Sequence, residues 1–220
     1  MKKEIVSLLV VLGALYSLSF FGCQNTPSSP EPQGTATVTP TSTATATVTP
    51  QSKTFVYTAS AYEDMEDAQV RNDYPDTSYP SNTVLSVGKL GSYQFEAFMY
   101  FSVTQVAAGS DIISAYLKLY NCSIGGSAGE HVFDIDKVTG AWDDSTLTWN
   151  TRPTTAYASS LTAVAGTLDI ALDLDMIQTW VDNSAVNYGM RLYKGGELLQ
   201  TFEFAASESA SKPELTIYYY

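Results

Sequence analysis

Few residues in this chain carry the side chains that enzymes use for catalysis. His131 is the one histidine, so no second imidazole is present to complete a metal-binding triad. Cys122 has no basic neighbour in the sequence to favour its thiolate, and we interpret it as a small residue of a core or sheet. Acidic pairs such as Asp143–Asp144 would suit glycoside hydrolysis only at a defined separation, and an acidic chain contains such pairs by chance. We therefore expect no enzyme activity.

Two acidic positions lie near the ends of the C-terminal part of the chain. Asp67 belongs to the stretch EDMED, residues 63–67, and Glu208 comes just before the last apolar run. The first and last strands of a sandwich are often neighbours, so both carboxylates can meet as oxygen ligands of a structural calcium ion. The alternative is a solvated acidic turn with one buried acid that is hydrogen-bonded to backbone amides. The first interpretation gives Asp67 and Glu208 a shared structural role, whereas the second gives such a role to one buried acid only.

Aromatic residues offer a different chemistry, because flat rings can stack on the faces of sugars. The chain has 15 tyrosines and three tryptophans. We expect Trp142, Trp149 and Trp180 to pack in the core rather than to bind a ligand. The candidate ligand-binding residues are tyrosines in loop-like segments: Tyr74, Tyr79, Tyr93 and Tyr157.

Residues 1–22 have the pattern of a bacterial lipoprotein signal peptide. A short basic start is followed by an apolar run from Ile5 to Phe21, which is short for a transmembrane span, and Gly22 then precedes Cys23. We expect lipidation of Cys23 and therefore an extracytoplasmic, membrane-anchored lipoprotein at the cell surface or in the periplasm. An ordinary secretory signal with an incidental cysteine is the alternative.

The segment 23–52 is rich in Pro, Thr, Ser and Ala and lacks aromatic residues. Such a composition cannot bury enough apolar surface to offset its conformational entropy, so we expect an extended linker. Residues 53–220 are long enough for a single domain with its own core. Because Cys122 is then the only cysteine of that domain, the domain cannot rely on an internal disulfide.

The charge of the chain limits its partners. The formal net charge is −12 at pH 7, and such a surface repels the phosphate backbone of nucleic acids. We expect no nucleic-acid partner. Contact with a membrane must then come from the lipid on Cys23 rather than from the surface of the domain.

The domain is predicted to consist mainly of short β-strands. Runs rich in β-branched and aromatic residues occupy 54–59, 83–88, 95–103, 114–122, 131–138 and 214–220, and turn-forming clusters separate most of them. Within 114–122, apolar residues alternate with Tyr116, Lys118 and Tyr120, which predicts one face toward the core and one toward solvent.

One segment, DLDMIQTWVD at 173–182, has helical rather than alternating spacing. Met176, Ile177 and Trp180 would share one face, and an aspartate at 173 or 175 would cap the start of the helix. Many short strands and one short helix predict an all-β protein, an antiparallel β-sandwich of the jelly-roll kind.

The stretch VTGAWDDSTLTWNTRP at 138–153 resembles the signature of the DNRLRE domain family, also described as carbohydrate-binding module family 96. That signature reads V-T-x-x-W-x-E-x-x-x-T-W-N-x-x-P. Further segments agree in order between residues 62 and 220, including DIISAYLKLY at 111–120 and IQTWVDNSAVNYGMRL at 177–192. The resemblance implies a β-sandwich that binds glycans. Its structural signature residues here are Trp142, Trp149, Asn150 and Trp180.

The chain also departs from the family pattern. The paired arginines around the family's L-L-R-F strand are absent, and Glu96 and Tyr100 stand near those places. If the family arginines contact acidic polysaccharides such as alginate, this chain has lost that contact, in keeping with its negative charge. We therefore expect a surface-tethered, non-catalytic carbohydrate-binding or adhesion module for a neutral or mixed polysaccharide. The alternative is a structural β-sandwich of an envelope or cell-surface assembly that binds no glycan.

Overall fold

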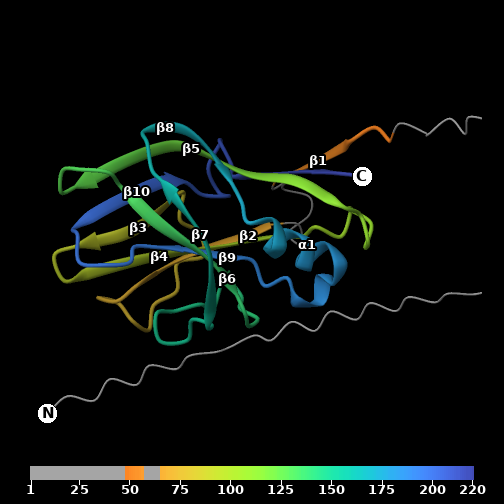
Figure 1. Ribbon diagram of the computed structural model, residues 1–220. Coiled ribbons are helices and arrows are strands. Elements are labelled where there is room, and N and C mark those ends of the chain that lie inside the picture. The colour runs from red at the N-terminus through yellow and green to blue at the C-terminus, as the bar shows by residue number, and fades with distance from the viewer. Residues whose placement is uncertain (1–47, 57–64) are drawn as a thin grey trace, which may run out of the picture. The chain divides into compact units, whose positions relative to one another are not determined.

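The computed structural model describes residues 48–56 and 65–220. Within these residues every strand pair is antiparallel, and one short α-helix is present (Figure 1). The strands are β1 Gln51–Val56, β2 Met65–Arg71, β3 Val84–Leu90, β4 Tyr93–Phe101, β5 Ile112–Gly126, β6 Val132–Val138, β7 Thr155–Thr162, β8 Gly166–Ala171, β9 Met190–Tyr193, β10 Gln200–Ala205 and β11 Glu214–Tyr219.

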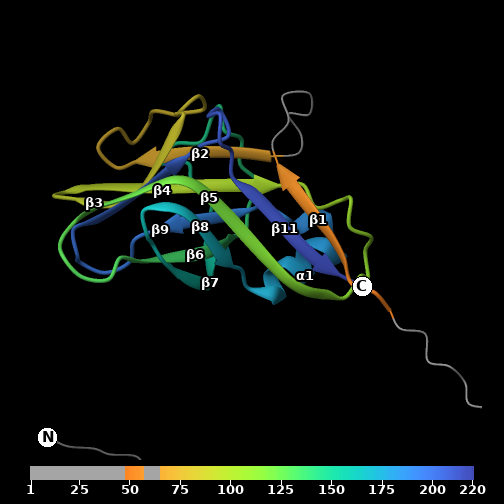
Figure 2. The same cartoon turned by 90° about the horizontal axis from the view of Figure 1, so that it is seen from above.

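The strands form one continuous hydrogen-bonded order, which β5 divides into two sheets, and Figure 2 shows them from a second direction. One sheet contains β1, β11, the first part of β5 and β8, and we call it the β11 sheet. The other contains β2, β3, β4, β6, β7, β9 and β10, and we call it the β4 sheet. The second part of β5 pairs with β10, so β5 belongs to both sheets.

The long strand β5 passes from one sheet to the other at a local irregularity. Lys118 pairs with Glu214 of β11, whereas Ser123 pairs with Glu203 of β10. Between them Asn121 has a positive φ of 53°, and the register with β8 shifts between Leu119 and Cys122. An unpaired residue of this kind bends a strand and increases its twist. The bend lets one continuous strand connect both layers.

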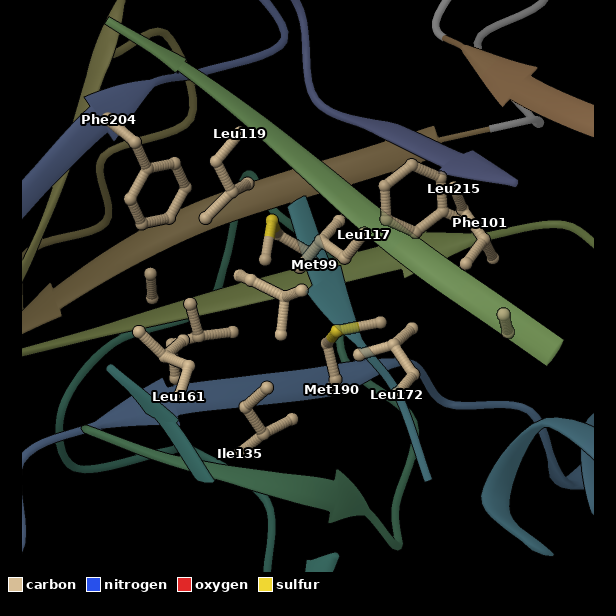
Figure 3. Close-up of a cluster of buried hydrophobic side chains, with 14 of the residues drawn as sticks. Met99, Phe101, Leu117, Leu119, Ile135, Leu161, Leu172, Met190, Phe204 and Leu215 are labelled. Atoms are coloured by element: carbon tan, nitrogen blue, oxygen red, sulfur yellow. The ribbon is translucent and has the colours of Figure 1, made fainter. Parts of the chain in front are cut away.

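The main core lies between the inward faces of the two sheets (Figure 3). Leu117 and Leu119 of β5 are fully buried, as the alternation in the sequence predicts. Met99 of β4 and Ile135 of β6 are also fully buried in the same cluster. Burying one such side chain contributes about 1.5–3 kcal/mol, so this cluster holds the two sheets together.

The helix α1, Leu174–Asp182, begins where the sequence predicts. The side chain of Asp173 accepts a hydrogen bond of 2.8 Å from the backbone N–H of Met176, which caps the helix. Trp180 is fully buried in the main core. The side-chain oxygen of Gln178 accepts a hydrogen bond of 3.0 Å from the backbone N–H of Ile112, at the start of β5. In the described part of the chain, no helix has the length and apolar character to cross a membrane.

The predicted antiparallel β-sandwich with one short helix is confirmed. The six predicted strand segments correspond to β1, β3, β4, β5, β6 and β11. The sequence does not predict strands β2 or β7 to β10, and in β2 the acidic residues Glu66 and Asp67 resemble a turn. Strand β1 starts at Gln51, inside the segment assigned to the linker.

Candidate functional site

The connection from β6 to β7, residues 139–154, covers part of the outer face of the β4 sheet. Side chains alternate along a strand, so Phe98 of β4 points away from the main core that holds Ala97 and Met99. This outer face has its own small apolar cluster of Ala68, Val70, Phe98, Val138 and Leu147, with Trp142, Trp149 and Tyr188 packed against it. The connection is therefore held to the sheet by apolar contacts.

Trp142 is fixed in two ways within this cluster. Its ring meets that of Phe98 edge to face, with ring centroids 5.8 Å apart. Its indole N–H donates a hydrogen bond of 2.8 Å to the backbone carbonyl of Tyr188. Tyr188 precedes Gly189, which has a φ of 78° and lies against the backbone of β4, where an added Cβ would come within 2.2 Å of the Met99 carbonyl oxygen. The tryptophan and the tyrosine are thus held side by side.

A pocket of about 260 Å³ opens beside Trp142, and we call it the tyrosine pocket. Its walls come from three regions of the chain: Glu66 and Tyr100 on the paired strands β2 and β4, Ala141 and Trp142 after β6, and Asn187 and Tyr188 before β9. The side chain of Asn187 is used internally, because it donates to the Phe101 carbonyl and accepts from the Gly189 N–H. Three aromatic rings and one carboxylate remain to face a ligand.

The electrostatic environment of the tyrosine pocket is acidic. Burial raises the pKa of Glu66, and the nearby carboxylates of Asp144 and Asp143 raise it further. The described residues that line the pocket include no lysine or arginine. A ligand that carries its own carboxylates would be repelled here.

A buried ion network lies next to the small cluster on the same face of the β4 sheet. Glu96 of β4 contacts Arg191 at 3.2 Å and Arg152 at 3.3 Å, and Arg191 also contacts Asp136 at 2.5 Å. Burial raises the pKa of Glu96, while the two arginines oppose this shift. The guanidinium of Arg152 also stacks on the ring of Trp149, 3.7 Å from its centroid. Glu96 therefore helps to anchor the covering connection.

Two of the four candidate tyrosines lie together, around Arg71. The guanidinium carbon of Arg71 lies 5.0 Å from the ring centroid of Tyr74 and 5.9 Å from that of Tyr79. Arg71 also makes a two-pronged ion pair with Asp73, with N–O distances of 3.0 and 2.7 Å. Tyr74 is 54% exposed, whereas Tyr79 is partly buried. The rings of Tyr74 and Tyr79 therefore already contact a cation of the protein itself, the Arg71 guanidinium.

Of the other two candidate tyrosines, Tyr93 lies at the same end of the β4 sheet as this cluster, because the backbone N–H of Asn72 donates a hydrogen bond of 3.1 Å to the Gln94 carbonyl, whereas Tyr157 lies on β7. Tyr93 starts β4 and is 47% exposed. Tyr157 of β7 is 67% exposed and borders a shallow groove that also contains Lys137, Asp173 and Asp175. The four tyrosines therefore do not form one common surface.

Asp67 and Glu208 lie near each other but in different surroundings. Asp67 is 2% exposed and accepts a hydrogen bond of 2.7 Å from the backbone N–H of Ser207. Glu208, the next residue, is exposed. Burial raises the pKa of Asp67 to about 7, and the charge of Glu208 contributes to this rise. The contact with Ser207 links β2 to the segment before β11.

Among the described residues, Asp67 and Glu208 do not belong to a larger cluster of His, Cys, Asp or Glu side chains. Calcium takes six to eight oxygen ligands, and no group of three or more His, Cys, Asp or Glu side chains that could hold a metal ion occurs among residues 48–56 and 65–220. Glu63 and Asp64 of the stretch EDMED lie outside the described residues. A calcium ion at Asp67 and Glu208 stays a prediction.

The remaining predicted residues are readily placed. Trp180 is in the main core, as predicted. The prediction is wrong for Trp142 and Trp149, which are partly buried against the small cluster on the outer face of the β4 sheet, and Trp142 lines the tyrosine pocket. Asn150 is exposed, and its side-chain amide donates a hydrogen bond of 2.8 Å to Asp76. Cys122 is buried, and burial raises the pKa of its thiol to about 11. Cys23 lies outside the described residues.

The sequence does not indicate Tyr100 and Tyr188 as residues of a binding site. The signal for Tyr100 is present, because alternation along FEAFMYF places Glu96, Phe98 and Tyr100 on one face of β4. No local pattern connects Tyr100 with Tyr188, which lies in a different part of the chain. Their meeting depends on the pairing of β4 with β9.

The chain was compared with curated proteins and with models of protein families. No curated protein matches the chain. The model of carbohydrate-binding module family 96 matches residues 58–219, which is most of the chain and includes the Trp142 connection and every wall of the tyrosine pocket. The resemblance predicted from the sequence is thereby confirmed. The chain belongs to carbohydrate-binding module family 96.

Proposed function

We propose that this protein is a non-catalytic module that binds a neutral or mixed polysaccharide through the tyrosine pocket. The observation that carries the proposal is a pocket walled by Tyr100, Trp142 and Tyr188 in a member of a carbohydrate-binding family. Aromatic rings give apolar faces for the C–H groups of a sugar. The Glu66 carboxylate and the tyrosine hydroxyls provide hydrogen-bonding partners for sugar hydroxyls.

The aromatic side chains of the pocket are held in fixed positions before a ligand binds. Trp142 is held by its hydrogen bond to the Tyr188 carbonyl, and Tyr188 is positioned by the tight approach of Gly189 to β4. Groups that are already fixed in the free protein lose little conformational entropy on binding. This arrangement favours recognition of a sugar ring without a rearrangement of the loop.

The charge around the pocket favours neutral over acidic glycans. Glu66 lies in the pocket wall, and Asp143 and Asp144 are close enough to raise its pKa. The net charge of the chain, −12, acts in the same direction at longer range. A uronate polymer would be repelled by the carboxylates at the pocket and by the net charge of the protein, whereas a neutral polysaccharide would not.

A binding role without catalysis agrees with the groups in the pocket. Glycoside hydrolases use two carboxylates on opposite sides of the scissile bond. Among the described residues that line the pocket, Glu66 is the one carboxylate. Glu66 then serves as a hydrogen-bond acceptor for the glycan.

We also propose that a lipid on Cys23 tethers the domain to a membrane. The support is the sequence of residues 1–23 and the Pro/Thr-rich segment that follows. Many anchored copies on one surface would combine weak single sites into useful avidity for a polymer. An adhesive or substrate-retaining role at the cell surface follows from this arrangement.

Alanine substitution in the pocket tests the binding site. Titration of the full chain with soluble neutral polysaccharides should show about 3- to 10-fold weaker binding for Tyr100→Ala, since one stacked ring contributes ~0.5–1.5 kcal/mol. Tyr100→Phe keeps the ring and should retain most of the affinity. Tyr93→Ala is the matched control, because Tyr93 is an exposed tyrosine on the same strand.

Three results would contradict the assignment. Equal affinity of wild type and Tyr100→Ala, with both proteins folded, would remove the tyrosine pocket as the site. A loss of affinity in Tyr93→Ala or Tyr74→Ala instead would move the site to the tyrosines in the loops. If no glycan binds at all, the protein is a structural β-sandwich of a surface assembly.

A further inference from the structure

The outer face of the β11 sheet carries a second group of tyrosines, remote in sequence from the tyrosine pocket. Strand register fixes which side chains share this face. Tyr116 of β5 lies opposite Thr216 of β11, and Lys118 lies opposite both Glu214 of β11 and Asp169 of β8. These residues, with Tyr218, line an open groove of about 350 Å³, which we call the β11 groove.

Two rings of the β11 groove are exposed and ordered relative to each other. Tyr116 and Tyr218 are each 40% exposed, although both belong to paired strands. Their ring centroids are 6.3 Å apart and their planes make an angle of 83°. An edge-to-face pair of this kind holds each ring in place. The two rings are thus partly exposed to a ligand in nearly perpendicular planes.

Polar groups surround the two rings at fixed positions. The hydroxyl of Tyr120 donates a hydrogen bond of 2.7 Å to Glu214, and the Lys118 ammonium lies 5.5 Å from the centroid of the Tyr120 ring. The hydroxyls of Thr54 and Thr216 are 3.0 Å apart. The groove thus combines aromatic faces with hydroxyl, carboxylate and ammonium groups, which matches a sugar with its apolar faces and its rim of hydroxyls.

The charges of the β11 groove identify the class of ligand. One cation, Lys118, lies between two carboxylates, Asp169 and Glu214. Such a surface gives no net attraction to a uronate polymer, a phosphate group or an anionic membrane. Because the two rings are nearly perpendicular, a flat crystalline surface would contact one of them only. A single flexible glycan chain can follow both.

We propose that the β11 groove binds a single chain of a neutral polysaccharide, as a second site separate from the tyrosine pocket. Tyr116 and Tyr218 each stack on a sugar of this chain, and Lys118, Glu214 and Thr216 bind its hydroxyls. The proposal extends the proposed glycan binding but does not depend on the pocket. Two sites on one domain would let it hold two chains or two stretches of one chain.

The test is calorimetric titration of the full chain with neutral hexasaccharides of β-1,4-linked glucose, mannose or xylose. The wild type should bind with two sites. The double variant Tyr116→Ala/Tyr218→Ala should lose one site, with affinity there weakened by about fivefold or more. Tyr116→Phe should retain that site. Tyr157→Ala is the matched control, because Tyr157 is an exposed strand tyrosine outside the groove.

Thr216→Arg is a second variant that keeps both rings and blocks the groove with a long side chain. Thr216→Arg should lose the same binding site as the double variant. If the double variant unfolds, Thr216→Arg provides the test. Wild-type binding by a folded double variant and by Thr216→Arg would overturn the inference.

The two proposed sites can fail separately. If Tyr100→Ala removes all binding and the groove variants remove none, the pocket stands and the β11 groove is not a site. If the groove variants remove all binding and Tyr100→Ala removes none, the groove stands and the pocket does not. If no hexasaccharide binds to the wild type, both proposals are overturned.

Discussion

The carboxylate of Asp67 accepts a hydrogen bond of 2.7 Å from the backbone N–H of Ser207, which lies 140 residues further along the chain. This contact joins β2, an early strand, to the segment that leads into the last strand. Asp67 is almost fully buried, and its pKa is raised to about 7, first by burial and then by Glu208. The contact is therefore both a structural link and a source of pH dependence.

The stability of the protein should fall as the pH rises from about 4.5 to about 7.5 because of Asp67. Over most of this window the folded protein keeps the Asp67 proton, because its pKa is about 7, whereas the unfolded chain, with an ordinary pKa of about 3.9, has lost it. The stabilising contribution is complete below the unfolded pKa and is lost as the pH rises through the folded pKa. It amounts to roughly 2–4 kcal/mol at most.

Asp67→Asn isolates this contribution, because asparagine keeps the shape and an acceptor oxygen but does not titrate. Thermal unfolding with a chelator present should show a smaller fall in Tm over this pH range for the variant than for wild type. Glu197→Gln, which removes an exposed carboxylate between β9 and β10, is the control and should follow wild type. Parallel curves for Asp67→Asn and wild type would refute the role of Asp67.

Removal of calcium provides a separate test of Asp67 and Glu208. An ion that binds only the folded state stabilises it by mass action, so a calcium site predicts a lower Tm with chelator and recovery on adding calcium. Asp67→Asn should abolish this response. A Tm that does not respond to chelator would leave Asp67 as an acceptor for the Ser207 amide alone.

The local features of the fold follow from the sequence. Asp173 and the spacing of Met176, Ile177 and Trp180 predict α1, because capping and helical periodicity involve neighbouring residues only. The alternation in β5 also predicts which side faces solvent, and Tyr116 lies on that side.

The strand β2 and the tyrosine pocket were not predicted, for a physical reason. Asp67 is buried because a distant amide satisfies its carboxylate, and no neighbouring residue indicates that partner. Tyr100, Trp142 and Tyr188 come together through strand pairing and through the apolar packing of the covering connection. The loop-like sequence around Tyr74 or Tyr93 favours those tyrosines as ligand contacts, whereas Tyr116 and Tyr218 lie within strands.

Gly189 should be intolerant of any side chain. Its φ of 78° is unfavourable for other residues, and a Cβ would come within 2.2 Å of the Met99 carbonyl oxygen. We expect Gly189→Ala to destabilise the protein by about 2–4 kcal/mol, as large backbone and packing defects do, and to displace Tyr188. Denaturant unfolding measures this.

Gly196 offers a matched control for that substitution. It also has a positive φ, 70°, but an added Cβ there meets no atom within 4 Å. Gly196→Ala should therefore cost only the conformational strain, about 1 kcal/mol. Equal losses at the two positions would show that the contact with β4 adds nothing.

The lipid anchor is tested by Cys23→Ser. If Cys23 carries the lipid, the variant should move from the detergent-rich phase to the aqueous phase in a detergent partition of cells that express the full chain. Cys122→Ser, at the buried cysteine of the domain, should leave the partition unchanged. An unaltered partition of Cys23→Ser would refute the anchor.

Binding of the full chain to neutral and acidic polysaccharides at low and high salt tests the central claim most directly. A soluble neutral glucan or mannan should bind with nearly equal affinity at about 0.05 M and about 0.5 M NaCl, because ring stacking does not depend on screening. Polyguluronate should bind much more weakly, since the chain has a net charge of −12. Tight binding of polyguluronate that disappears as the salt concentration rises, with no binding of the neutral polymers, would contradict the account.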